Sequence, residues 1–221
     1  MLTYIILALF ACAAVANLVG NWIENRILCT VSKPMLVSLL LLAYLSGGAP
    51  GPKVFLICAL AASWLGDVLL MLKGTGWFVA GGTSFGCAHI LLVIAFSQYA
   101  GGVSGPIAAV ICLAAVYGAV TGFLIYKIRN EAPRPLLLPM ALYLLCNGTM
   151  NLFVFLWMLS APGVGTVLTY VGAVLFFVSD CILIRLRFHK CEENRIKPNF
   201  LIMLTYILGM YLITQGVLLA G

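Results

Sequence analysis

Eight long apolar runs, separated by short breaks, constrain this chain more than any other feature. A helix needs about 20 apolar residues to cross the hydrocarbon core of a bilayer. The sequence is 64% hydrophobic and 8% charged, whereas a soluble domain is roughly a quarter charged. A globule of 221 residues has too little interior for this much apolar sequence, so we expect a bilayer to surround it. The predicted spans are 2–21, 33–47, 53–72, 77–99, 106–127, 135–159, 164–185 and 198–220.

The breaks between the runs hold glycine, proline and most of the charged residues. Because these breaks are short, neighbouring helices should pack antiparallel, and no room remains for a soluble domain. We therefore predict an all-α, polytopic membrane protein, a bundle of eight transmembrane helices that forms one domain over residues 1–221. The second run is short and has room to begin earlier. The first run lacks the basic start and cleavage pattern of a signal peptide and is predicted to be a span.

The basic residues predict the orientation of the bundle. Eleven of the 12 Lys and Arg follow the first, third, fifth or seventh span, and only Lys53 falls on the other side. Under the positive-inside rule those four loops face the cytosol, so both termini are predicted to be non-cytosolic. The net charge of +6 is then juxtamembrane and does not indicate nucleic acid. The eleven residues are Arg26, Lys33, Lys73, Lys127, Arg129, Arg134, Arg185, Arg187, Lys190, Arg195 and Lys197.

Asp67 and Asp180 are the two acidic residues that fall inside predicted spans. A carboxylate in hydrocarbon is unfavourable by a few kcal/mol or more, which makes such a residue a candidate for function. Each lies five residues before the predicted cytosolic end of its span, at Leu72 or Arg185. At about 1.5 Å per residue, both are roughly 7–8 Å below the boundary. The shared depth allows the two carboxylates to meet if the third and seventh spans are neighbours.

Other polar side chains lie on the remaining spans, several of them in stripes at helical spacing. Polar stripes are unfavourable against lipid, so we expect them to converge on a cavity that opens toward the cytosolic half of the membrane. Interhelical hydrogen bonding explains Asn147, Asn151 and Tyr206 equally well, and His89 fits a packed core histidine. Arg185 and Arg187 are predicted to snorkel to lipid phosphates. The candidates for support or substrate binding are Lys33, Asn17, Asn21, Ser84, His89, Tyr143, Asn147, Ser179, Tyr206, Tyr211 and Gln215.

Metal and disulfide chemistry find little support in the sequence. Its eight cysteines form no CxxC pair, and a single histidine, His89, falls inside a span. We expect no cofactor and no metal site. The run of small residues at 79–82 is predicted to serve close helix packing rather than phosphate binding.

Several short pieces, spread over nearly the whole chain, form one set. They are Lys33-Pro34, Leu65-Gly66-Asp67 with Leu69-Leu70, Phe85 to His89, Tyr143 with Met150, Phe177-Val-Ser-Asp180, and Tyr211 with Gln215. With these residues the chain resembles the YhhN-like lysoplasmalogenase family, a group of eight-helix integral membrane proteins. One departure is Thr214, where the family usually has Ala before the Gln.

The resemblance implies hydrolysis of the vinyl ether bond of lysoplasmalogens, with Asp67 and Asp180 as the catalytic pair. Vinyl ethers are cleaved by acid, so the site needs one protonated carboxylic acid and one carboxylate, as glycosidases and aspartic proteases do. A lysophospholipid places its chain in the bilayer and the reacting bond just below the interface. Lys33 fits contact with its phosphate as well as it fits a membrane anchor. The basic loops 127–134 and 185–197 could attract its head group.

Alternatives from other classes stay open. A proton- or cation-coupled transporter could use the same two aspartates, although no inverted repeat is visible. An intramembrane aspartyl protease is less favoured, because Leu65-Gly66-Asp67 lacks the fuller Gly-x-Gly-Asp signature. The expected partners are a lysophospholipid and the bilayer, with no nucleic acid. The compact chain favours a bacterial inner membrane over the endoplasmic reticulum.

Overall fold

The computed structural model describes residues 1–48, 53–101, 106–188 and 197–220. Within these ranges it contains eight α-helices and no strand, as the sequence predicts. All eight are long and apolar enough to cross a membrane. The helices are α1 (Leu2–Trp22), α2 (Arg26–Gly47), α3 (Lys53–Met71), α4 (Thr75–Tyr99), α5 (Ile107–Ile128), α6 (Arg134–Ser160), α7 (Val164–Phe188) and α8 (Pro198–Ala220).

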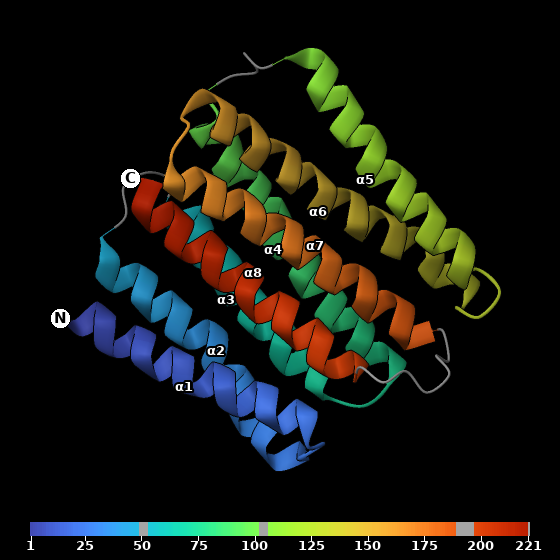
Figure 1. The fold of residues 1–221 in the computed structure, drawn as a ribbon. Helices are drawn as coiled ribbons and strands as arrows, with labels where there is room; N and C mark the ends of the chain where they lie inside the picture. The colour runs from blue at the N-terminus through green and yellow to red at the C-terminus, as the bar shows by residue number, and fades with distance from the viewer. Residues whose placement is uncertain (49–52, 102–105, 189–196, 221) are drawn as a thin grey trace.

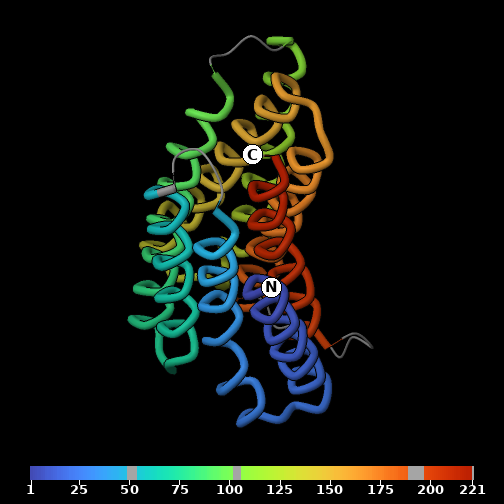
Figure 2. The backbone as a smooth tube through the Cα atoms, turned by 90° about the vertical axis from the view of Figure 1, so that its left-hand side faces the viewer, coloured from blue at the N-terminus to red at the C-terminus, as the bar shows by residue number. Residues whose placement is uncertain are grey.

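Six of the helices close into a ring. Following the packing contacts from α2 leads through α3, α4, α6, α7 and α8 and back to α2. The other two helices pack on the outside of this ring: α1 against α2 and α8, and α5 against α6 and α7. Figure 1 shows α1 and α5 at opposite edges of the bundle. The side view in Figure 2 shows the helices running alongside one another.

The second helix begins earlier than its predicted start at residue 33. It starts at Arg26, because the Asn25 side chain caps it by accepting a hydrogen bond of 3.1 Å from the Leu28 backbone N–H. Pro34 therefore lies inside α2 rather than at its start. The indole Nε1–H of Trp64 on α3 donates to the Pro34 carbonyl at 3.1 Å. This bond joins α3 to α2 at the proline.

Helices α7 and α8 approach each other most closely through glycines. A Cβ on Gly172 would lie 2.7 Å from the Gly209 carbonyl oxygen, and a Cβ on Gly209 would lie 2.9 Å from that of Gly172. One heptad away, Gly165 and Gly216 repeat the arrangement. Small residues at helix interfaces let the backbones pack tightly without a hydrophobic driving force. These contacts bring the backbones of α7 and α8 together at two levels. Gly81 likewise packs on α3, as predicted for the run at 79–82.

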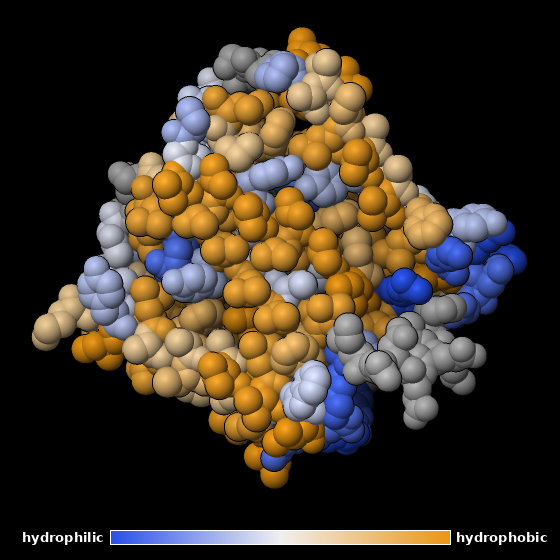
Figure 3. All heavy atoms as spheres, viewed as in Figure 1, coloured by the Kyte–Doolittle hydropathy of each residue, from blue (hydrophilic) through white to orange (hydrophobic). Residues whose placement is uncertain are grey.

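The outer surface is mostly apolar, as lipid contact requires. Figure 3 shows hydrophobic residues over most of this face and hydrophilic residues gathered toward one end. Many large side chains point outward, for example Ile111 and Phe123 of α5. At the charged end, Lys197 pairs with Glu24 at 2.9 Å and ties the turn after α1 to the start of α8. The Lys197 ammonium lowers the pKa of the Glu24 carboxyl. Lys190 and Arg195 lie outside the described residues.

Candidate functional site

A cavity of about 280 Å³ lies inside the ring, and both buried aspartates line it. Asp67 comes from α3 and Asp180 from α7, and their exposed fractions are 1% and 4%. Among the described residues these two helices do not pack against each other. The carboxylates thus reach one space from opposite parts of the ring. The other polar groups at this cavity are Lys33, Ser179, Arg187, Asn199 and Tyr206.

Asp67 is held between a cation and a phenol. The Lys33 ammonium of α2 lies 3.4 Å from Asp67 Oδ1. The Tyr206 hydroxyl of α8 donates to Asp67 Oδ2 at 2.6 Å. Trp64 precedes Asp67 by three residues and bonds the Pro34 carbonyl, next to Lys33 in the sequence. This second link between α2 and α3 keeps the ammonium beside the carboxylate.

The glycine before Asp67 has a steric role. A Cβ on Gly66 would lie 2.5 Å from the Phe85 ring of α4. Phe85 in turn packs edge-on against Tyr206, with ring centroids 6.0 Å apart. Gly66 therefore makes room for the aromatic ring that supports the partner of Asp67. This gives the Gly-Asp pair a packing reason that is independent of chemistry.

Asp180 has a different set of partners. The Asn147 amide of α6 donates to Asp180 Oδ2 at 2.7 Å. The Tyr143 hydroxyl, one turn earlier on α6, also hydrogen-bonds to this carboxyl group. His89 Nε2 of α4 lies 3.7 Å from Oδ2, which is too long for a hydrogen bond. Asp180 thus faces neutral donors and an imidazole, whereas Asp67 faces an ammonium.

A buried chain of hydrogen bonds sets the direction of the Asn147 amide. Asn151 Nδ2 donates to Asn147 Oδ1 at 3.0 Å. The Tyr117 hydroxyl of α5 donates to Asn151 Oδ1, also at 3.0 Å. With its oxygen engaged by Asn151, Asn147 presents its NH₂ group to Asp180. Tyr117 therefore reaches the site from outside the ring, through two asparagines that are completely buried.

His89 is buried among aromatic rings. Its ring centroid lies 5.1 Å from that of Tyr143 and 4.9 Å from that of Phe176. Neither of its nitrogens makes a hydrogen bond within the described part of the chain. A buried polar group without a partner is unfavourable and calls for an explanation. Because Nε2 lies beside Asp180, a molecule bound at this carboxyl group is a candidate for its missing hydrogen-bond partner.

Several predicted residues do not reach the cavity. Asn17 and Asn21 bond to each other, and Asn17 donates to Ser32 Oγ at 2.9 Å, which links α1 to α2. The Ser84 hydroxyl donates to the Ala62 carbonyl of α3 at 2.7 Å. Asn17 and Ser84 therefore join helices, and Asn21 bonds to Asn17 within α1. None of the three lines the cavity.

Of the predicted residues on α7 and near the end of α8, Ser179 lines the cavity, and Tyr211 and Gln215 do not. Tyr211 stacks on Phe10 of α1 with ring centroids 5.6 Å apart. Gln215 follows Tyr206 by nine residues, or about 13 Å along α8, and its Nε2 is buried without a partner among the described residues. Ser179 does line the cavity, but its hydroxyl donates to the Ile202 carbonyl of α8 at 3.1 Å.

Two residues at the cavity were not among the sequence candidates. Arg187 was predicted to snorkel to lipid phosphates, yet it lines the cavity with its guanidinium 5.1 Å from the Phe78 ring. Asn199 lies at the start of α8. Each lies seven residues, or two helical turns, from a site residue and therefore on the same helix face. Arg187 comes seven residues after Asp180, and Asn199 comes seven residues before Tyr206. That spacing was the signal available in the sequence.

No metal centre is evident in the described ranges, where no group of three or more His, Cys, Asp or Glu could hold an ion.

A family model described as the YhhN family matches residues 28–217 of the chain. No curated protein matches the sequence. No solved structure matches it either.

Proposed function

The chain belongs to the YhhN family, and from this premise and the geometry of the cavity we propose that it is a membrane-embedded hydrolase of the vinyl ether bond of lysoplasmalogens. The observation that carries the proposal is the pair of buried aspartates that line one cavity with unlike partners. Acid cleavage of a vinyl ether needs a proton donor and a negative charge at the same time. Two carboxyl groups in different surroundings can divide these tasks.

We assign the two roles from the partners. Asp67, 3.4 Å from the Lys33 ammonium and bonded by Tyr206, is the carboxylate. Asp180 has no Lys or Arg within ion-pair distance in the described part of the chain, and it is the acid that carries the proton. Asn147 and Tyr143 hold this acid in a fixed orientation. A fixed orientation matters because the proton has to reach a carbon atom.

The reaction then proceeds in three steps. Asp180 gives its proton to the β-carbon of the vinyl ether, and the electron pair of the double bond forms the new C–H bond. The resulting oxocarbenium ion is stabilised by the negative charge on Asp67. Water adds to the cation and returns one proton to the carboxyl pair. The hemiacetal then breaks its C–O bond to the glycerol oxygen. That oxygen takes one proton from the carboxyl pair, the hemiacetal hydroxyl returns one proton to the pair as the C=O bond forms, and fatty aldehyde and glycerophospho-alcohol leave.

The cavity also matches the polarity of a lysophospholipid. Arg187 and Asn199 lie at the charged end of the bundle and line the same cavity as the aspartates. A guanidinium is well suited to a phosphate oxygen pair. The head group would then lie toward Arg187, which leaves the reacting bond beside Asp67 and Asp180. Lys33 is engaged by Asp67 and serves the carboxylate rather than the phosphate.

The experiment that tests the proposal is aldehyde release from lysoplasmalogen by detergent-purified protein. We expect Asp67→Asn and Asp180→Asn each to lower kcat by about 10²–10⁴-fold, the usual contribution of a general acid or base. Glu24→Gln makes the same carboxyl-to-amide change at the exposed turn after α1 and should leave the rate unchanged. Comparing hydrolysis of a lysolipid that carries an ester in place of the vinyl ether measures the selectivity of the protein for the vinyl ether bond. Full activity in either aspartate variant contradicts the proposal.

The same assay separates a transporter that uses both aspartates. A carrier needs a gradient and two compartments and would release no aldehyde in detergent. Proton or cation uptake by proteoliposomes, lost in Asp67→Asn, would favour the transporter if no aldehyde appears. Aldehyde release without a gradient excludes it as the explanation of the buried pair.

A further inference from the structure

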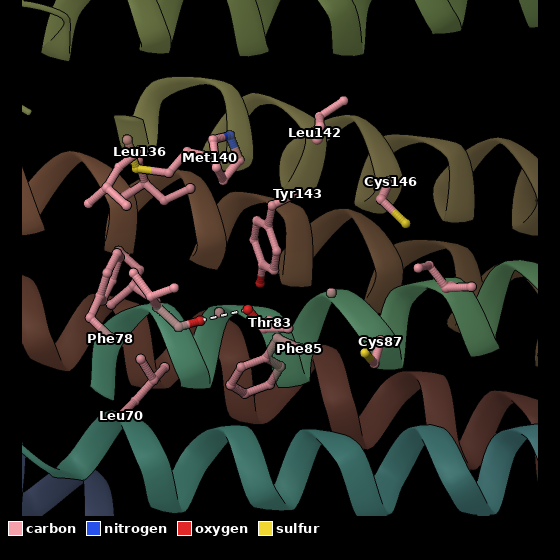
Figure 4. A pocket seen from close by; sticks show the side chains of 17 residues that line it. Leu70, Phe78, Thr83, Phe85, Cys87, Leu136, Met140, Leu142, Tyr143 and Cys146 are labelled. Carbon is pink, nitrogen blue, oxygen red and sulfur yellow. Dashed lines mark hydrogen bonds between the residues drawn. The ribbon is translucent and has the colours of Figure 1, made fainter. Parts of the chain in front are cut away.

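A second, larger hollow lies beside the aspartate cavity, between α4 and α6. Its volume is about 320 Å³, and its lining is almost entirely apolar. Figure 4 shows Phe78 and Leu136 at one end of this groove and Cys87 and Cys146 at the other. Ile90 and Leu142, which also line it, are 53% and 57% exposed. The groove therefore opens sideways, on the face of the bundle that lipid covers.

The groove and the aspartate cavity share part of their walls. Leu70, Phe78, Phe85 and Leu183 line both. Tyr143 also lines the groove, and its hydroxyl bonds to Asp180. In Figure 4 the Tyr143 side chain projects from α6 into the space before α4. A molecule whose polar part contacts the aspartates could thus extend an apolar part into the groove without crossing a helix.

The length of the groove fits one hydrocarbon chain. On α4 it runs from Phe78 to Ile90, which is about 18 Å along the helix axis. One leaflet of a hydrocarbon core of about 30 Å is roughly 15 Å thick. We propose that the groove between α4 and α6 binds the single hydrocarbon chain of the lysolipid substrate while its ether bond lies at the aspartates. This inference rests on the proposed function for the reaction, but its own test measures binding alone.

Glycine keeps the groove open. Gly82 lines it, and a Cβ at this position would meet nothing within 4 Å. Gly82→Leu therefore fills the groove from the side of α4 without a clash inside the bundle. Gly122 of α5 also has nothing within 4 Å but does not line the groove, so Gly122→Leu is the matched control.

The test uses native cysteines as reporters. Cys87 and Cys146 line the groove, whereas Cys12 and Cys112 are exposed on α1 and α5. The purified protein is treated with a lipid-soluble maleimide, and labelling of each thiol is followed by mass spectrometry. The probe is a lysophospholipid with a saturated alkyl ether chain, which has no vinyl ether to cleave. We expect it to slow labelling of Cys87 and Cys146 at least fivefold and to leave Cys12 and Cys112 unchanged.

The variants and a second lipid decide between outcomes. Gly82→Leu should abolish the protection, and Gly122→Leu should retain it. Protection by a two-chain phospholipid with the same head group, as strong as that by the lysolipid, would mean that the groove holds ordinary bilayer lipid, and this overturns the inference. Unprotected Cys87 and Cys146 overturn it as well. Protection in a protein that releases no aldehyde would refute the hydrolase and leave the chain site standing.

Discussion

The donor that faces Asp180 is fixed by residues that never touch the cavity. Asn147 gives its NH₂ group to Asp180 because Asn151 engages its oxygen, and Tyr117 in turn engages Asn151. Each link is a buried hydrogen bond of 3.0 Å or less. Such a chain has one satisfied arrangement, and losing an outer member lets the inner amides rotate. Tyr117 is thus a positioning residue for the proposed acid.

Tyr117→Phe tests this role. Removing one hydrogen bond of about 1–1.5 kcal/mol should lower kcat roughly tenfold. We expect KM to change little, because Tyr117 does not line the cavity. The melting temperature should fall by only a few degrees, because a buried hydrogen bond is lost while the packing of the ring against Phe177 remains. Tyr126→Phe, on the same helix but with an exposed side chain, is the control and should retain full activity. An equal fall in both variants, or a rise in KM alone, would contradict a positioning role.

The asparagines also mark a limit of sequence reasoning at this scale. Asn17 and Asn21 form the same local motif as Asn147 and Asn151, since the later residue of each pair donates to the earlier one. The earlier residue then donates to Ser32 in one case and to Asp180 in the other. Spacing predicts each pair but not its outer partner. That partner depends on which helix lies opposite.

Among the helices, α7 and α8 depend most on small residues. Asp180 and Tyr206 lie on this pair, and the backbones meet at Gly172 and Gly209. A change in the spacing of these helices would move both side chains relative to Asp67. The packing of one helix pair therefore sets the width of the proposed active site.

Gly172→Ala should show this dependence. Its Cβ would lie 2.7 Å from a backbone carbonyl oxygen, which cannot move without its helix. We expect a loss of about 1–3 kcal/mol of stability, as for other overpacked interfaces, together with reduced aldehyde release. Gly118→Ala on α5, where nothing lies within 4 Å, should leave both unchanged. Thermal unfolding in detergent measures the effect, and an unchanged melting temperature in Gly172→Ala would refute the tight contact.

The helices illustrate which boundaries a sequence predicts. Seven of them begin and end within a few residues of the predicted spans, because apolar runs end where charges, Gly or Pro begin. The start of α2 was wrong by seven residues. Lys33-Pro34 resembles a helix start, but the capping contact of Asn25 places the start a further two turns back. The helix therefore runs from the cap at Asn25 through Pro34.

In the molecule as a whole, every helix of the ring supplies a polar group to the aspartate site. Lys33, Asp67, His89, Asn147, Asp180 and Tyr206 come from α2, α3, α4, α6, α7 and α8 in turn. The shared depth of the two aspartates was predictable from the sequence, because helix rise and span ends fix it. The order of the helices around the ring was not, since eight antiparallel spans can close in many ways. The ring order decides which polar residues meet.

The orientation of the bundle is the prediction at this scale. With eight spans, both termini lie on one side, and Figure 1 shows the two ends of the chain on the same side of the bundle. The basic loops predict that this side is non-cytosolic. In a bacterial host, alkaline phosphatase fused after Gly221 should be active and green fluorescent protein at the same place dark. Fusions truncated after Arg129, at the end of α5, should give the opposite pair of results. A fluorescent fusion at Gly221 would place the termini in the cytosol and contradict the predicted orientation.

The sideways groove next to a charged cavity has a consequence for the fate of the products. The groove is lined by apolar residues, and the cavity beside it by Arg187 and Asn199. After cleavage, the apolar fatty aldehyde and the polar glycerophospho-alcohol would no longer be joined by a covalent bond. On the proposed mechanism, the aldehyde would leave through the groove into the acyl chains, and the glycerophosphate would leave past Arg187 and Asn199 into water. Because the two products would partition into different phases, they would rarely meet again at the site. The membrane would thus oppose the reverse reaction.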